Sequence, residues 1–188
     1  MENVSVKSNL RDITQIAMMA ALTFIATFII RVPSLAGGYT HIGDSMVFIG
    51  VILLGKKKGV ISAAVGMFLS DLIGGYLLWS PFTLVIKGVM ALIAGSIAFR
   101  KNYNGKNMLN NIFAFIISGI WMVIAYLFAG AIIAKINVAS AKSLFAGLIV
   151  SLKDVPGNII EVLIGILIAV PIIYLLDKSS FFKKINQE

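Results

Sequence analysis

Six long apolar stretches, separated by short loops, constrain the fold of this chain more than any other feature. They cover residues 13–30, 42–54, 60–78, 82–99, 108–134 and 157–176. A helix needs roughly 20 residues to cross a hydrocarbon core about 30 Å thick, so stretches of this kind are typical of membrane-spanning helices. Only 13% of the 188 residues are charged and the mean hydropathy is +0.98, which is too apolar for a soluble domain of this size. We therefore predict one all-α domain, residues 1–188, that crosses a membrane six times.

The lysines and arginines indicate how the helices are oriented. With the N-terminus in the cytoplasm, eleven of the sixteen basic residues fall in cytoplasmic segments, four fall outside, and Lys87 lies within a span. This bias follows the positive-inside rule, and an even number of spans places both termini on the cytoplasmic side. The basic residues lie in short loops and not on one face, so we expect no nucleic acid partner.

The composition also excludes several kinds of chemistry. The chain has no cysteine, which rules out disulfides, thiolate metal sites and cysteine nucleophiles, and His41 is its one histidine. The carboxylates show no short-range catalytic spacing, and there is neither an HExxH motif nor a phosphate-binding loop. We expect no catalytic residues, no metal and no catalytic cofactor, and the protein is not predicted to be an enzyme.

Two segments depart from a simple up-and-down bundle. The second span has thirteen residues, about 20 Å of helix, and Lys56 to Lys58 hold its inner end at the headgroups. The deficit then falls at the outer end, where residues 35–41 are predicted to dip into the membrane as a movable lid; a plain outer loop is the alternative. Residues 143–152 are apolar but too short to cross, which favours a re-entrant or interfacial helix. Pro171 is expected to kink the last span.

Polar side chains within the spans gather toward one membrane face. With alternating helix directions, the outer half holds Asp44, Asp71, Lys87, Asn158 and Glu161. Ionisable groups in hydrocarbon are costly, so they usually face a cavity or a partner and mark a functional site. The pattern predicts a polar pocket that opens to the outside.

The first candidate residues come from three consecutive spans. Thr83 and Lys87 are four residues apart and share the outer face of the fourth span. Lys87 either contacts the ligand or forms an ion pair with Asp71, because a lone buried ammonium is costly. Asp44 lies in the first turn of the second span, where it either caps the helix or contacts the ligand.

Asn158 and Glu161 form a second candidate group. They are three residues apart at the start of the last span, so an amide and a carboxylate share one face and could clamp a ligand. The alternatives are a helix cap for Asn158 and an ion pair with Lys153 or Lys87 for Glu161.

One histidine and several aromatic residues complete the candidate ligand site. His41 precedes the second span and is a possible donor to a heterocycle, although it could equally be an exposed loop residue. Four aromatic residues could stack on a flat ring: Tyr39, Trp79, Trp121 and Tyr126. Aromatic residues near span ends also occur as interfacial belts, an alternative that applies most to Trp79.

Several short motifs match a known family. They are His41-Ile42-Gly43-Asp44, Leu54-Gly55, Asp71-Leu72, Trp79-Ser80-Pro81-Phe82-Thr83-Leu84, Ile86-Lys87-Gly88 and Pro156-Gly157-Asn158. Together they resemble the substrate-binding S components of energy-coupling factor (ECF) vitamin importers. The resemblance is to the branch that includes riboflavin, hydroxymethylpyrimidine and pyridoxine carriers.

This resemblance implies a protein of the bacterial cell membrane (inner or plasma membrane) that captures a water-soluble vitamin or precursor from outside. The expected partners are the lipid bilayer, a transmembrane coupling subunit (EcfT-like) and two cytoplasmic ATPase subunits. The ligand would be held by the first loop and the outer halves of the later helices. Ala17, Ala20 and Ala21 would form the docking face for the coupling subunit; small residues at this spacing could instead only pack the bundle.

A stand-alone, ion-coupled secondary transporter is the main alternative function. Asp71, Lys87 and Glu161 could then form an ion relay, and transport would need no ATP. The sequence shows no internal repeat of the kind on which many such transporters are built, which favours the S-component hypothesis.

Overall fold

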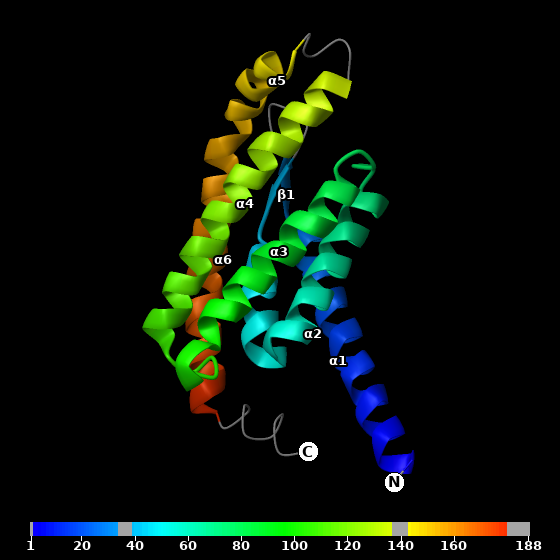
Figure 1. Cartoon of the computed structure of the whole chain (residues 1–188), viewed down its shortest axis with the longest axis vertical. Helices are drawn as coiled ribbons and strands as arrows, with labels where there is room; N and C mark the ends of the chain where they lie inside the picture. Colours follow the sequence, from blue (N-terminus) through cyan, green and yellow to red (C-terminus); the bar gives the residue numbers. More distant parts are fainter. Residues whose placement is uncertain (1, 34–38, 137–142, 180–188) are drawn as a thin grey trace.

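The computed structural model describes residues 2–33, 39–136 and 143–179. Helices dominate it, which agrees with the all-α prediction, and a two-stranded hairpin is added between the first two helices (Figure 1). The elements are α1 (Glu2–Ile29), β1 (Arg31–Pro33), β2 (Tyr39–His41), α2 (Asp44–Ile73), α3 (Ser80–Ala98), η1 (Arg100–Asn102), α4 (Met108–Ile136), α5 (Leu144–Ser151), η2 (Leu152–Asp154) and α6 (Val155–Lys178).

The helix α2 reverses direction at Gly55 and therefore contains both the second and the third predicted spans. Gly55 has φ +79°, a conformation that glycine adopts readily. A Cβ atom on Gly59 would lie only 2.6 Å from the Cα atom of Val51, whereas residues eight apart in a continuous helix are separated by about 12 Å. Residues 44–54 and 56–73 are thus two antiparallel arms of a tight helical hairpin.

The third predicted span ends earlier than expected. We predicted helix as far as Leu78, but α2 ends at Ile73, and a turn with Gly75 at φ +85° leads into α3. Pro81 lies in the first turn of α3, where its missing N–H leaves no helical hydrogen bond unmade. Trp79 is the N-cap residue of α3 and lines a cavity at this end of the bundle.

The segment that we predicted to be re-entrant extends α6 instead. α5, η2 and α6 follow one another without a reversal, and α5 lies on the end of α4 (Figure 1). The contact is close, because a Cβ atom on Gly147 would lie 2.5 Å from the carbonyl oxygen of Ala131. The re-entrant alternative is wrong, because residues 143–152 are followed directly by more helix of the same direction. The interfacial alternative stays a prediction.

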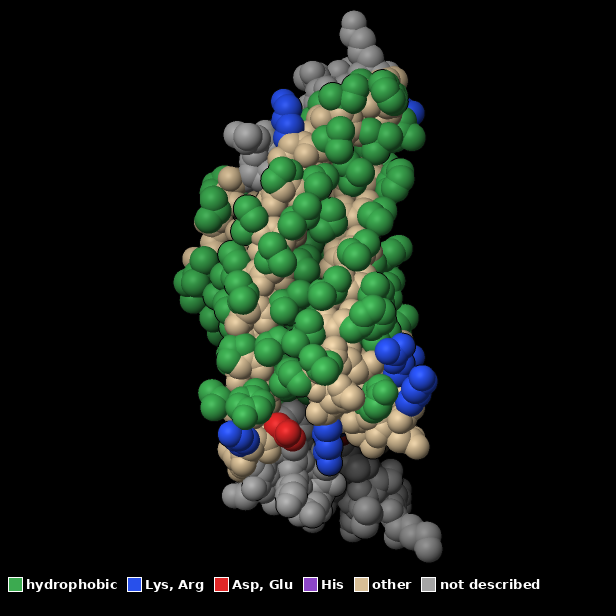
Figure 2. Space-filling view, turned by 90° about the vertical axis from the view of Figure 1, so that its left-hand side faces the viewer, with side chains coloured by type: hydrophobic (Ala, Val, Ile, Leu, Met, Phe, Trp, Pro, Cys, Tyr) green, Lys and Arg blue, Asp and Glu red, His purple; other side chains and the backbone are tan. Residues whose placement is uncertain are grey.

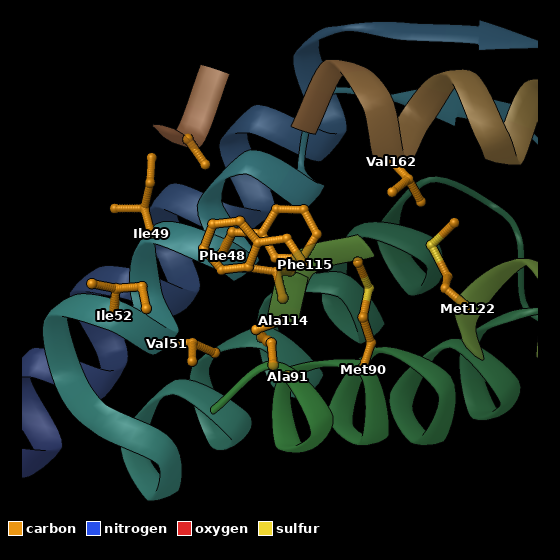
Figure 3. Packing of buried hydrophobic residues seen from close by; sticks show 14 of the residues in the cluster. Phe48, Ile49, Val51, Ile52, Met90, Ala91, Ala114, Phe115, Met122 and Val162 are labelled. Atoms are coloured by element: carbon orange, nitrogen blue, oxygen red, sulfur yellow. The ribbon is translucent and has the colours of Figure 1, made fainter. Parts of the chain in front are cut away.

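The core lies between α2, α3, α4 and α6. Phe48 and Phe115 stack at its centre with ring centroids 4.3 Å apart, and Val51, Met90 and Ala91 lie nearby (Figure 3). Small side chains on α3 allow the helices to approach closely, and Ala91, Ala94 and Ala98 are fully buried there.

The outer surface is suited to a lipid environment. Four helical stretches are long and apolar enough to cross a membrane: Asn9–Ile29, Ser80–Ala98, Met108–Ile136 and Leu144–Lys178. Hydrophobic side chains cover most of the height of the face in Figure 2, with lysines and arginines concentrated near its lower end. The start of α1 and the end of α6 both lie at the lower end of Figure 1, whereas the β hairpin and α5 lie toward the other end.

Candidate ligand-binding site

A polar cavity lies at the end of the bundle that holds the β hairpin. It is bounded by β2, the end of the second arm of α2, the first turns of α3 and α6, and the middle of α4. Its lining consists of Tyr39, Thr40, His41, Asp71, Trp79, Thr83, Tyr126, Asp154, Asn158 and Glu161. The free volume is only about 40 Å³, enough for a few waters and far below the ~300 Å³ at which small-molecule sites begin. A ring-sized ligand therefore needs some lining side chains to move.

A buried lysine organises the floor of this cavity. The Lys87 Nζ atom lies 2.6 Å from Glu161 Oε1 and also forms an ion pair with Asp44, and its side chain is 0% exposed. Met122 Sδ is 2.9 Å from the same nitrogen. The ion pair with Asp71 that the sequence suggested is not formed. Lys87 pairs instead with Asp44, at the start of α2, and with Glu161, on α6. Two carboxylates share this one ammonium.

Asp44 acts through this cluster and does not cap its helix. The residue at the N-cap of α2 is Gly43, and no side chain caps the helix there. One carboxylate oxygen of Asp44 accepts from Lys87, whereas Oδ2 has no hydrogen-bond partner among the described residues. Because no side chain caps α2, the capping interpretation was wrong. Asp44 is fully buried behind the cavity wall, so a direct ligand contact needs a rearrangement.

His41 is buried and neutral, not an exposed loop residue. Its Nδ1 atom accepts the backbone N–H of Gly43 at 3.1 Å, so the ring proton is on Nε2, which faces Glu161 Oε1 at 3.4 Å. Burial, and next the positive charge of Lys87, lower the pKa of His41 to about 3. The imidazole therefore offers an N–H donor to the cavity without adding a charge.

Tyr39 closes one side of the cavity through a hydrogen bond to Asp71. Its hydroxyl donates to Asp71 Oδ1, and burial together with the nearby Asp71 charge raises the pKa of Tyr39 far above its ordinary value. Arg31 supports the ring from outside, with its guanidinium carbon 4.9 Å from the Tyr39 centroid and 4.1 Å from that of Phe28. The Arg31 head also donates to the backbone oxygen and hydroxyl of Ser70. The hairpin is thereby tied to both α1 and α2.

An aromatic corner forms the opposite wall. The rings of Trp79 and Tyr126 lie 6.1 Å apart at 50°, and the Tyr126 hydroxyl donates to Thr83 Oγ1 at 3.1 Å. Lys87 Nζ is 5.4 Å from the centroid of the Tyr126 ring. Both rings line the cavity, so Trp79 is not only an interfacial residue.

The oxygen and nitrogen atoms that could bind a metal here already surround a cation. Ligand atoms of His41, Asp44 and Glu161 lie within 4.8 Å of one another. The ammonium of Lys87 contacts both carboxylates, however, and occupies the place that a metal ion would take. The arrangement fits a fixed internal charge better than a metal centre.

Most of the sequence-predicted ligand residues therefore lie around one cavity, with Asp44 and Lys87 directly behind its wall. Sequence reasoning missed Thr40 and Asp154. Thr40 lies between Tyr39 and His41 in the sequence, and both neighbours were predicted ligand residues, so its position could have indicated it. Asp154 belongs to η2, a short 3-10 turn that was not anticipated. Of the predicted lid, residues 35–38 lie outside the described part of the chain, and Tyr39 to His41 form β2.

The three alanines proposed for docking do not share one environment. Ala17 and Ala21 are exposed on the outer face of α1. Ala20 is buried against α2, where a Cβ atom on Gly66 would lie 2.5 Å from the Ala20 carbonyl oxygen. Ala20 therefore serves packing within the bundle, and only Ala17 and Ala21 are available to a partner.

Comparisons with known proteins point to one family. Residues 7–178 match the family model described as ECF-type riboflavin transporter, S component. The chain is 27% identical over 146 residues to the thiamine precursor transporter HmpT of Lactococcus lactis subsp. cremoris, covering 68% of this chain and 86% of that protein. It is 35% identical over 103 residues to an uncharacterized protein of Pyrococcus woesei, covering 54% of this chain and 66% of that one.

A solved structure shares the fold. It is the S component of a bacterial ECF transporter, which superimposes with a TM-score of 0.63 at 23% identity and covers 94% of this chain and 99% of that one.

Proposed function

This chain belongs to the family of ECF-type riboflavin transporter S components, and we propose that its polar cavity captures a small, planar vitamin or vitamin precursor from outside the cell. It is a membrane protein and the substrate-binding subunit of an ECF-type vitamin importer, not an enzyme. The observation that supports the site is the cavity itself, in which hydroxyls, an amide, an imidazole and carboxylates converge between aromatic rings. Such a mixture of a few fixed polar groups and flat apolar walls is typical of small-molecule sites.

We propose that the bundle crosses the membrane six times, with both termini in the cytoplasm. Each arm of the α2 hairpin then counts as one crossing, and α5 with η2 and α6 forms the last. The start of α1 and the end of α6 lie at the same end of the molecule, away from the β hairpin (Figure 1), and residues of β2 line the cavity. Lys56 to Lys58, beside the α2 reversal, belong to the cytoplasmic end under the positive-inside rule. The cavity then opens to the outside.

The proposed partners are a transmembrane coupling subunit and two cytoplasmic ATPase subunits. The exposed face of α1 supports a docking role, because Ala17 and Ala21 leave a shallow stripe on which another helix can pack closely.

The ligand candidates are riboflavin, hydroxymethylpyrimidine and pyridoxine-like compounds. The matched family is named for riboflavin and one relative for a thiamine precursor, and both names describe compounds with flat heterocyclic rings. Tyr39, Trp79 and Tyr126 supply the aromatic walls. We propose no cofactor for catalysis; the vitamin is the transported substrate.

The most direct test is mass spectrometry of the small molecules that remain with the detergent-purified protein. A retained heterocyclic vitamin or precursor is the expected result. Liposomes that contain the protein alone should show no uptake of that compound, and uptake should require the coupling subunit, the ATPases and ATP. Uptake by the protein alone, driven by an ion gradient, would instead establish the secondary transporter and refute the S-component function.

A further inference from the structure

The charge around the cavity is unevenly distributed. Three carboxylates line it, from Asp71, Asp154 and Glu161, whereas no lysine or arginine is among the lining residues that the structure describes. His41 also lines the cavity but is neutral. A ligand therefore meets three carboxyl groups and no lysine or arginine among these lining residues.

Two described cations near the cavity, Lys87 and Arg31, already have partners. Lys87 lies behind Glu161 and is shared between that residue and Asp44. Arg31 donates to Ser70 and stacks on Phe28 outside the hairpin. Both cations therefore lie near the cavity but are not among its lining residues.

The aromatic walls favour the same ligand charge. Tyr39, Trp79 and Tyr126 line the cavity, and aromatic faces attract cations. A carboxylate beside such a ring can accept two parallel N–H bonds from a planar, amino-bearing cation, which are stronger than neutral hydrogen bonds. A phosphate group would instead lie beside three carboxyl groups, with no lysine or arginine among the described lining residues to pair with it.

We propose, building on the vitamin-binding function above, that the ligand of this cavity is a planar heterocycle that bears an amino group or a positive charge, and that its phosphate esters are excluded. Glu161 and Asp71, which both line the cavity, accept its N–H donors. Lys87 does not bind the ligand directly; it holds Glu161 in place from behind.

Matched ligand pairs test this proposal on the purified full chain in detergent. Pyridoxamine and pyridoxine differ only by an ammonium in place of a hydroxyl, and 4-amino-5-hydroxymethyl-2-methylpyrimidine is compared with its 4-oxo counterpart. Pyridoxamine 5′-phosphate and riboflavin complete the set, and binding is measured by titration calorimetry. The amino member of the pair whose ring is recognised should bind at least tenfold more tightly, and the phosphate ester should bind at least tenfold more weakly than pyridoxamine.

Substitution of the carboxylates provides the second readout. Asp71→Asn and, separately, Glu161→Gln should reduce the preference for the amino member at least threefold. Asp12→Asn is the matched control, because Asp12 pairs with Lys58 on the exposed face of α1, outside the cavity. It should leave the preference unchanged.

The outcomes separate this proposal from the vitamin-binding function. Equal binding within both pairs, preference for the oxo or hydroxyl member, or tight binding of riboflavin with neither pair bound would overturn the charge proposal and leave the vitamin-binding function standing. If none of the set binds, the compound retained on purification decides: an amino-bearing or cationic ring supports the proposal, and a neutral or anionic one overturns it. No binding and no retained vitamin would refute both.

Discussion

Replacing Lys87 with methionine should destabilise the protein far more than the same replacement of an exposed lysine. The side chain of Lys87 is 0% exposed and is the shared partner of Asp44 and Glu161. Methionine fills a similar volume but leaves two carboxylates in the core without a cation. The cost is therefore electrostatic more than steric.

The structure sets the size of this effect. At the 2.6 Å separation of Lys87 and Glu161, an effective dielectric constant of ~20 gives about 6 kcal/mol of gross attraction. Desolvation cancels part of that, and removal of one partner of a buried ion pair costs about 3–5 kcal/mol. For a chain of this length, each kcal/mol shifts the midpoint of thermal unfolding by about 2–4 °C. We expect Lys87→Met to lower that midpoint by roughly 6–20 °C.

Lys58 provides the matched control. It pairs with Asp12 at 2.8 Å, but the two side chains are 29% and 53% exposed, so Lys58→Met should cost about 1 kcal/mol or less. Both variants are compared with the wild type by thermal unfolding in the same detergent. In the double variant Lys87→Met/Asp44→Asn, one of the two unpaired carboxylates is neutralised, so part of the lost stability should return. A loss for Lys87→Met no larger than that for Lys58→Met would refute the reasoning.

Three other predictions concern separate parts of the molecule. Gly59→Ala should lower the free energy of unfolding by about 3 kcal/mol, as in overpacked cores, because the new Cβ atom would lie 2.6 Å from the backbone of Val51. Gly88→Ala is the control, because its Cβ atom would have its nearest neighbour at 3.4 Å. Burial lowers the pKa of His41 to about 3, whereas an unfolded histidine gains its proton near pH 6.5, so acidification from pH 6.5 to 5 should lower the free energy of unfolding of the wild type by about 2 kcal/mol. His41→Asn should not show that part of the loss. Identical dependence of the unfolding free energy on pH in the two proteins would contradict this prediction. Ala17→Trp should abolish ATP-driven uptake and leave ligand affinity unchanged. Ala20→Trp should instead impair folding, since Ala20 is buried against α2. Loss of ligand affinity in Ala17→Trp would contradict the docking role.

The helices and the location of the polar site could be predicted from the sequence, because both follow from local patterns. Apolar length gives the spans, and the rarity of ionisable residues makes each one informative; Glu161 and Asp71 do line one cavity. The choice of partners could not be predicted. Lys87 pairs with Asp44 and not Asp71, because the reversal of α2 brings the start of that helix to the same depth as Lys87.

Two other differences have similar causes. The span that ends at Ile73 was predicted to run to Leu78, since hydropathy does not detect where a turn interrupts an apolar segment. The 143–152 segment was judged by its own length, whereas its structure depends on continuing into α6. The burial of Ala20 beside exposed Ala17 depends on the rotation of α1 against α2, which spacing of small residues alone does not set.

The placement of α1 has a mechanical consequence. This helix packs along α2 and touches β2, and its outer face is open. Arg31 lies two residues beyond the end of α1, donates a hydrogen bond to Ser70 and stacks on the ring of Tyr39. The Tyr39 hydroxyl in turn donates to Asp71, and both residues line the cavity. A protein that tilted α1 from the lipid side would thus move Arg31 and, through it, Tyr39 at the cavity wall. It could release the bound ligand without contacting it.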